Sequence, residues 1–166
     1  MAPSDLVIGR PENFSEVGYG SPLMAVRRAL LPLVSHDRMA LTGDCLTIDQ
    51  VNETGFTISL LRSSDCWIVF FDDWHDEFSD LEMVLVLIGQ ALSGNVRLRV
   101  DRMGQKPWRW TVERKLADRT WVALYSNAVF MLGRGQANDT VIFCNGRDDA
   151  KQEAPLALRL PLKHVG

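Results

Sequence analysis

The sequence has only three cysteines in 166 residues. Cys45, Cys66 and Cys144 are odd in number, widely spaced and set in apolar or alternating stretches. A disulfide framework needs an even set at regular spacing, and a thiolate metal site needs closely spaced pairs. The spacing therefore excludes both classes, and we expect three buried, reduced thiols.

Long apolar runs are also missing. The longest unbroken one, Met83 to Ile88, is far shorter than the roughly 20 residues that a membrane-spanning helix requires. The N-terminal residues lack the basic region and apolar stretch of a secretion signal. We therefore expect no membrane contact and a cytoplasmic location.

The chain has no large excess of either charge, with a net charge of −3 and a pI of about 5.6. Proteins that coat nucleic acid rely on Lys and Arg to displace phosphate counterions, so nucleic acid is a disfavoured partner. A hydrophobic fraction of 46% and a length of 166 residues are typical of one globular domain. We expect that domain over 21–146, with a flexible arm at 1–20 and a tail at 147–166.

Alternation of apolar and polar residues predicts a mostly antiparallel sheet and an α+β fold. The period is clearest in Phe56–Leu60, where apolar and hydroxyl side chains alternate. We expect about 6–8 strands in two meanders, forming one continuous sheet with a helix across it. The predicted strands are Cys45–Ile48, Phe56–Leu60, Trp67–Phe71, Val96–Val100, Trp108–Val112, Thr120–Tyr125, Ala128–Leu132 and Thr140–Cys144.

Two helices are predicted from their caps. Ser21 followed by Pro22 is typical of a helix start, so we expect a helix over about 22–35 that Pro32 kinks or ends. The segment Ser79–Glu82 fits a capping box and predicts a helix over about 80–92. That second helix is apolar on nearly every side, which favours a buried position.

One acidic segment between a predicted strand and the second helix is a candidate metal site. Its carboxylates and single imidazole suit a magnesium, manganese or iron ion, and the ligands would be Asp72, Asp73, His75, Asp76 and Glu77. Against this, no second histidine stands nearby. The alternative is a solvated loop whose acids complement the start of the helix, with Trp74 as a binding residue at its rim or as part of the core.

Charge is distributed unevenly along the chain. Residues 65–82 include seven acids and no base, whereas residues 96–120 include eight bases and three acids. We expect Arg97, Arg99 and Arg109 to share one sheet face, where they would bind an anion or form a solvated surface. If the two segments are neighbours in the fold, they neutralise each other; if not, the basic hairpin is a recognition surface.

Three functional hypotheses remain open. The leading one is a non-catalytic binding or interaction domain with a protein partner or self-association. The second is a metal-assisted hydrolase that uses residues 72–77, with Arg97 or Arg109 holding an anionic substrate; apart from this metal, no cofactor is predicted. The third is a binder of a small apolar ligand between sheet and helix.

Overall fold

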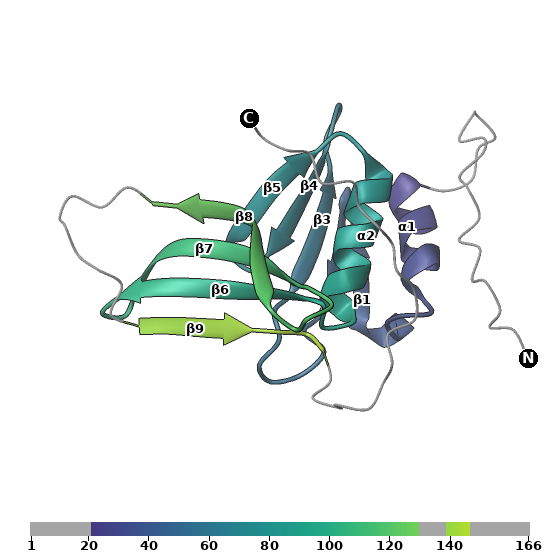
Figure 1. Cartoon of the computed structure of the whole chain (residues 1–166). Helices are drawn as coiled ribbons and strands as arrows, with labels where there is room; N and C mark the ends of the chain where they lie inside the picture. The colour runs from purple at the N-terminus through teal and green to yellow at the C-terminus, as the bar shows by residue number, and fades with distance from the viewer. Residues whose placement is uncertain (1–20, 130–138, 147–166) are drawn as a thin grey trace, which may run out of the picture.

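The structure, a computed structural model, describes residues 21–129 and 139–146 (Figure 1). The elements in these residues are α1 (Pro22–Leu30), η1 (His36–Arg38), β1 (Met39–Thr42), β2 (Cys45–Ile48), β3 (Ile58–Arg62), β4 (Trp67–Phe71), β5 (Trp74–Phe78), α2 (Leu81–Leu92), β6 (Val96–Met103), β7 (Lys106–Lys115), β8 (Trp121–Ala128) and β9 (Asp139–Phe143). The predicted arm, the predicted tail and most of the predicted strand Ala128–Leu132 lie outside the described residues.

Strands β1 to β5 form sheet A, an antiparallel meander in which each strand pairs with the next. The predicted alternation is confirmed, because Ile58 and Leu60 are buried while Ser59 between them is only half-buried. The three central strands were predicted. The edge strand β1 was not, since its four residues are too few to show a period.

The acidic segment differs most from its prediction. It is not a loop but strand β5, which forms a hairpin with β4 through the two-residue turn Asp72-Asp73. Trp74 and Phe78 point into the core at the two ends of β5, and their burial stabilises a strand whose middle is polar. Trp74 is therefore a core residue, with 0% of its surface exposed.

The remaining strands form sheet B in the order β8-β7-β6-β9. The pairing of β6 with β7 confirms the predicted hairpin of Val96–Val100 with Trp108–Val112, and in it Leu98 lies opposite Val112. The prediction of one continuous sheet is wrong, because sheets A and B are separate and their strands cross in Figure 1. A period of two identifies strands but does not say which strands share a sheet.

Helix α1 begins at Ser21, whose Oγ accepts the N–H of Leu23 at 3.3 Å, as predicted. It ends at Leu30, short of the predicted residue 35, because Pro32 follows. Helix α2 begins at Leu81, and its N-cap is Asp80, whose Oδ1 accepts the N–H of Glu82 at 2.8 Å. The predicted capping box, with Ser79 as the cap, is therefore wrong by one residue.

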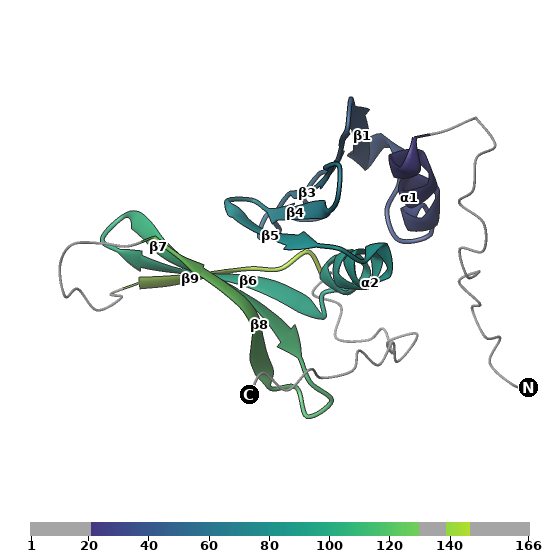
Figure 2. The ribbon, with the colours of Figure 1, turned by 90° about the horizontal axis from the view of Figure 1, so that it is seen from above.

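Helix α2 lies where the two sheets converge and contacts β4, β5 and β6 (Figure 2). Helix α1 covers β2. Side chains from both helices and both sheets join in a single hydrophobic core. Its largest fully buried side chains are Trp74, Phe56 and Phe71, and neighbouring rings among them lie 4.8–5.2 Å apart.

The two sheets are joined where β9 ends, at residues 144–146, which meet loop 51–57; we call this contact the joint. Asn145 is 1% exposed, and its Oδ1 accepts the N–H groups of Val51 and Phe56 while its Nδ2 donates to Phe56 O at 2.8 Å. Gly146 packs against Gly94, and a Cβ added at Gly146 would lie 2.5 Å from Gly94 Cα. The joint therefore fixes the distance between the sheets at this point.

Candidate functional site

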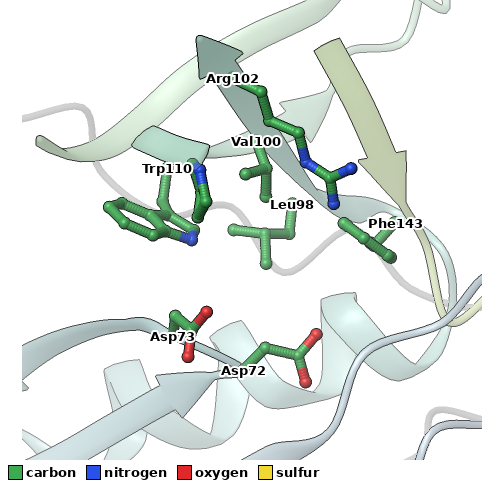
Figure 3. Close-up of a pocket in the computed structure, with 8 residues that line it drawn as sticks. Asp72, Asp73, Leu98, Val100, Arg102, Trp110 and Phe143 are labelled. Carbon is green, nitrogen blue, oxygen red and sulfur yellow. The ribbon is translucent and has the colours of Figure 1, made fainter. Parts of the chain in front are cut away.

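Beyond the joint, a cleft separates the β4–β5 turn from the inner face of sheet B (Figure 3). Its floor is apolar and consists of Leu98, Val100, Trp110 and Phe143. Strand alternation turns Leu98 and Val100 toward the cleft, and the pairing of Leu98 with Phe143 places β9 beside them. Pro107 and Arg102 line the cleft at the tip of the β6–β7 hairpin.

The opposite lip of the cleft is acidic. Asp72 and Asp73 form the β4–β5 turn and face the floor (Figure 3). Asp72 has a φ of 49°, a left-handed conformation that aspartate tolerates better than most residues. Its backbone N–H donates to Thr57 O, and its Oδ1 accepts the N–H of Thr57 at 3.0 Å. These bonds tie the acidic lip to the end of the loop that makes the joint.

Ionisation of Asp72 on the acidic lip is less favourable than ionisation of an ordinary aspartate. Partial desolvation raises the pKa of Asp72 above its ordinary value, and the neighbouring carboxylate of Asp73 raises it further. The hydrogen bond from Thr57 acts in the opposite direction without cancelling the rise. A positive charge arriving at the lip would relieve this cost.

Arg102 faces the acidic lip from the far side of the cleft (Figure 3). Among the described residues it makes no ion pair with Asp72 or Asp73, and its buried Nε has no hydrogen-bond partner. A buried N–H without a partner costs about 1–3 kcal/mol. The cleft therefore presents unpaired groups of both charges above an apolar floor.

The three predicted arginines lie on the other face of sheet B, where acids of the same sheet neutralise them. Arg97 Nε and Arg99 Nη1 donate to Glu113 at 2.6 and 2.7 Å. Arg109 donates to Asp101 from both Nε and Nη2 at 2.7 and 2.6 Å. The two carboxylate side chains are only 5% exposed, and the arginine side chains lie along the surface of this face. We call this row of ion pairs the ladder.

Aromatic rings extend that ladder. The Arg97 guanidinium lies 4.2 Å from the ring centre of Trp121, and the Arg109 guanidinium lies 4.9 Å from that of Trp108. Neither expected arrangement of the charged segments is found, because the bases of 96–120 that form ion pairs do so with Asp101 and Glu113 of their own sheet. In the described part of the chain, the acids of residues 65–82 make no ion pair.

The residues predicted to bind a metal do not converge. His75 and Glu77 project from the exposed face of β5, where the His75 ring lies 5.4 Å from that of Phe70. Asp76 projects from the other face and accepts the N–H of Glu77, while Asp72 and Asp73 lie at the turn. Over residues 21–129 and 139–146, no three His, Cys, Asp or Glu side chains are grouped closely enough to hold a metal ion.

The cleft floor was missed by the sequence prediction. Leu98, Val100 and Trp110 alternate with charged residues just as core residues do, so the pattern assigns them to the core. That assignment is confirmed for Leu98 and Val100, which are buried in the core, whereas Trp110 is half-buried and the pattern does not predict the cleft beside it. The three cysteines are free, as predicted, but half-buried rather than buried.

Comparison with known proteins finds no family model, no curated protein and no solved structure that matches this chain. No helix within the described residues has both the length and the apolar character needed to cross a membrane.

Proposed function

We propose that this chain is a non-catalytic protein-interaction domain whose binding site is the cleft between sheets A and B. The observation that carries the proposal is a narrow cleft with a partly exposed apolar floor, in which Trp110 and Phe143 are half-buried and Leu98 and Val100 are buried beside them. Exposed apolar surface with a polar rim is typical of sites where proteins meet, and a half-buried tryptophan is a common anchor of such contacts.

The size of the cleft favours a side chain of a partner over a free small molecule. Its volume of about 90 Å³ is smaller than the roughly 150 Å³ cavity that accommodates one benzene molecule. Pockets for drug-sized ligands hold about 300–1,000 Å³. An aliphatic side chain carried by an extended segment fits the cleft, with the rest of the segment lying along its open mouth.

The divergent orientation of the acidic side chains supports binding over metal-assisted hydrolysis. A catalytic metal needs several ligands directed at one point. In β5 the pleat directs His75 and Glu77 to one side and Asp76 to the other, and no cleft separates them from solvent.

Selection of peptides from a random dodecapeptide library displayed on phage tests the proposal. The bait is the immobilised full chain, compared with its Trp110→Ala variant. Trp121→Ala is the matched control, because Trp121 is also half-buried and lies in the same sheet, but on the opposite face, against Arg97. We expect enriched peptides that bind wild type and Trp121→Ala equally and bind Trp110→Ala about tenfold more weakly or worse, as for an anchor residue.

A second variant covers the case in which Trp110→Ala does not fold. Pro107→Trp places a ring at the exposed mouth of the cleft without altering the core, and it should block the same peptides. If no peptide is enriched, or if the enriched peptides ignore both cleft variants, the proposed function is wrong.

A further inference from the structure

The charges around the cleft define the chemistry of the segment that it binds. We propose that this segment carries a lysine or arginine beside its inserted apolar side chain, and that the cation lies between the Asp73 carboxylate and the Trp110 ring. This inference rests on the proposed function, and it adds the class of partner: an extended polypeptide with a basic-apolar pair.

The first step is that the acidic lip is not neutralised from within the protein. The nearest large set of bases, on sheet B, is occupied by Asp101 and Glu113 on the face opposite to the cleft. Asp72 and Asp73 have no ion pair among the described residues. Burial raises the pKa of Tyr125, and the charge of nearby Asp76 raises it further. Negative charge therefore accumulates along the β4–β5 hairpin beside the cleft.

The second step is the position of each charge within the cleft. In Figure 3, Asp73 lies on the side of Trp110, and Asp72 lies on the side of Phe143 and Arg102. Arg102 would repel a cation from its own side. A cation is therefore best placed at the Asp73 side, where a carboxylate and an aromatic ring both line the cleft.

The third step is the strength of such a contact. A cation over a tryptophan ring is attracted by the negative face of the ring, and the attraction is stronger when water is excluded. A charge-assisted hydrogen bond to a carboxylate is roughly twice as strong as a neutral one. Both interactions act together on one ammonium or guanidinium group, while the neighbouring apolar side chain of the partner contacts Phe143, the other half-buried residue of the floor.

Arg102 gives the bound segment a direction. Its buried Nε–H has no acceptor among the described residues, so a backbone carbonyl or carboxylate of the partner at the Phe143 side would satisfy it. A free divalent cation fits the lip less well, because calcium takes 6–8 oxygen ligands and Asp72 already uses Oδ1 to accept the Thr57 N–H.

The peptides selected above test this inference separately from the proposed function. Among peptides that depend on Trp110, we expect enrichment of Lys or Arg next to an aliphatic residue. A synthetic peptide with that pair should lose about tenfold in affinity when its Lys is replaced by Met, which keeps the length of the side chain. The same loss should follow Asp73→Asn in the protein.

Asp65→Asn is the matched control, because Asp65 belongs to the same acidic run but lies exposed in the β3–β4 turn, away from the cleft. It should leave the affinity unchanged. Raising the salt concentration should weaken binding to wild type more than binding to Asp73→Asn. Isothermal titration calorimetry of the purified chain with each peptide measures these affinities.

The possible outcomes distinguish the two proposals. If the selected peptides depend on Trp110 but lack basic residues, or if Asp73→Asn binds as tightly as wild type, the inference about the cation is wrong and the proposed function stands. If no selected peptide depends on the cleft, both are wrong.

Discussion

The two faces of sheet B differ in the ion pairing of their charged residues. On the outer face, the guanidinium groups of Arg97, Arg99 and Arg109 bind the nearly buried carboxylates of Glu113 and Asp101, and Thr140 donates a further bond to Asp101. On the inner face, Arg102 has no ion pair among the described residues, although two aspartates lie across the cleft from it.

This difference shows why a cluster of arginines is a poor guide to a binding site. Ionised groups that already satisfy one another have little to offer a ligand, because the ligand would have to replace bonds that exist. Charged groups that are partly desolvated and have no ion pair gain the most interaction energy when a ligand of opposite charge binds. The ion-pair ladder is therefore a structural feature. The charged groups of the cleft, in contrast, make no ion pair among the described residues.

The largest effect is expected at the joint, where Asn145 after β9 bonds the loop between β2 and β3. Asn145→Ala removes three hydrogen bonds to the backbone of Val51 and Phe56 and leaves buried groups without partners. We expect a loss of about 3–5 kcal/mol in the free energy of unfolding, at about 1–3 kcal/mol for each buried group left unsatisfied. Urea denaturation followed by tryptophan fluorescence measures it.

Asn95→Ala is the control for this change, since within the described residues the side chain of half-buried Asn95 bonds only the hydroxyl of exposed Ser93. It should cost less than about 0.5 kcal/mol, as surface substitutions usually do. Equal losses for Asn145→Ala and Asn95→Ala would show that the joint does not hold the sheets together.

The fold was largely predictable from the sequence, and the site was not. Period-two alternation in segments such as Val96–Val100 identifies strands because each side chain samples the environment of one sheet face. Trp74 shows the limit of this reasoning: in an acidic setting it resembled a rim residue, but its burial depends on contacts with Phe71 and Tyr125 that no local pattern contains. Likewise, nothing local to Asn145 indicates that it bonds residues about 90 positions away.

The same limit applies to the charged residues. The sequence placed Arg97, Arg99 and Arg109 on one face correctly, because strand alternation is local. It could not show that Asp101 and Glu113 would be buried among them, since that depends on the register between β6 and β7 and on the bulge between Asp101 and Arg102.

Two matched substitutions on β6 test whether the charged residues of the two faces differ in their ion pairs. The expected change in the free energy of unfolding is intermediate in size. Arg99 and Arg102 are both half-buried, and methionine preserves much of their apolar stem. Arg99→Met removes ion pairs to Glu113 and Asp101 and should cost about 1–2 kcal/mol, less than for a fully buried pair because Arg99 is 31% exposed.

Arg102→Met removes a buried Nε–H that has no partner among the described residues, so it should not lower the free energy of unfolding and should raise it by up to about 1 kcal/mol. Thermal and urea denaturation of both variants at the same pH measure the two effects. Equal destabilisation by the two substitutions would mean that Arg102 has a structural partner and that the faces do not differ.

The smallest effect is expected from the charge of Asp72, which the cleft holds at a cost. Because partial burial and Asp73 raise its folded-state pKa, the folded protein binds this proton more tightly than the unfolded chain does. The stability contributed by protonation is fully present below the ordinary pKa of 3.8 and is lost as the pH rises through the raised value. Asp72→Asn keeps an oxygen for the Thr57 N–H and tolerates the left-handed backbone, but it cannot ionise.

At neutral pH, Asp72→Asn should therefore be slightly more stable than wild type, and the difference should disappear as the pH is lowered past 3.8. Urea denaturation of the two proteins across pH 3–7 measures this difference while the other acids titrate alike in both. The opposite sign, with the variant less stable at neutral pH, would mean that the Asp72 carboxylate is stabilised in the free protein. The statement that partial burial makes ionisation of Asp72 unfavourable would then be wrong.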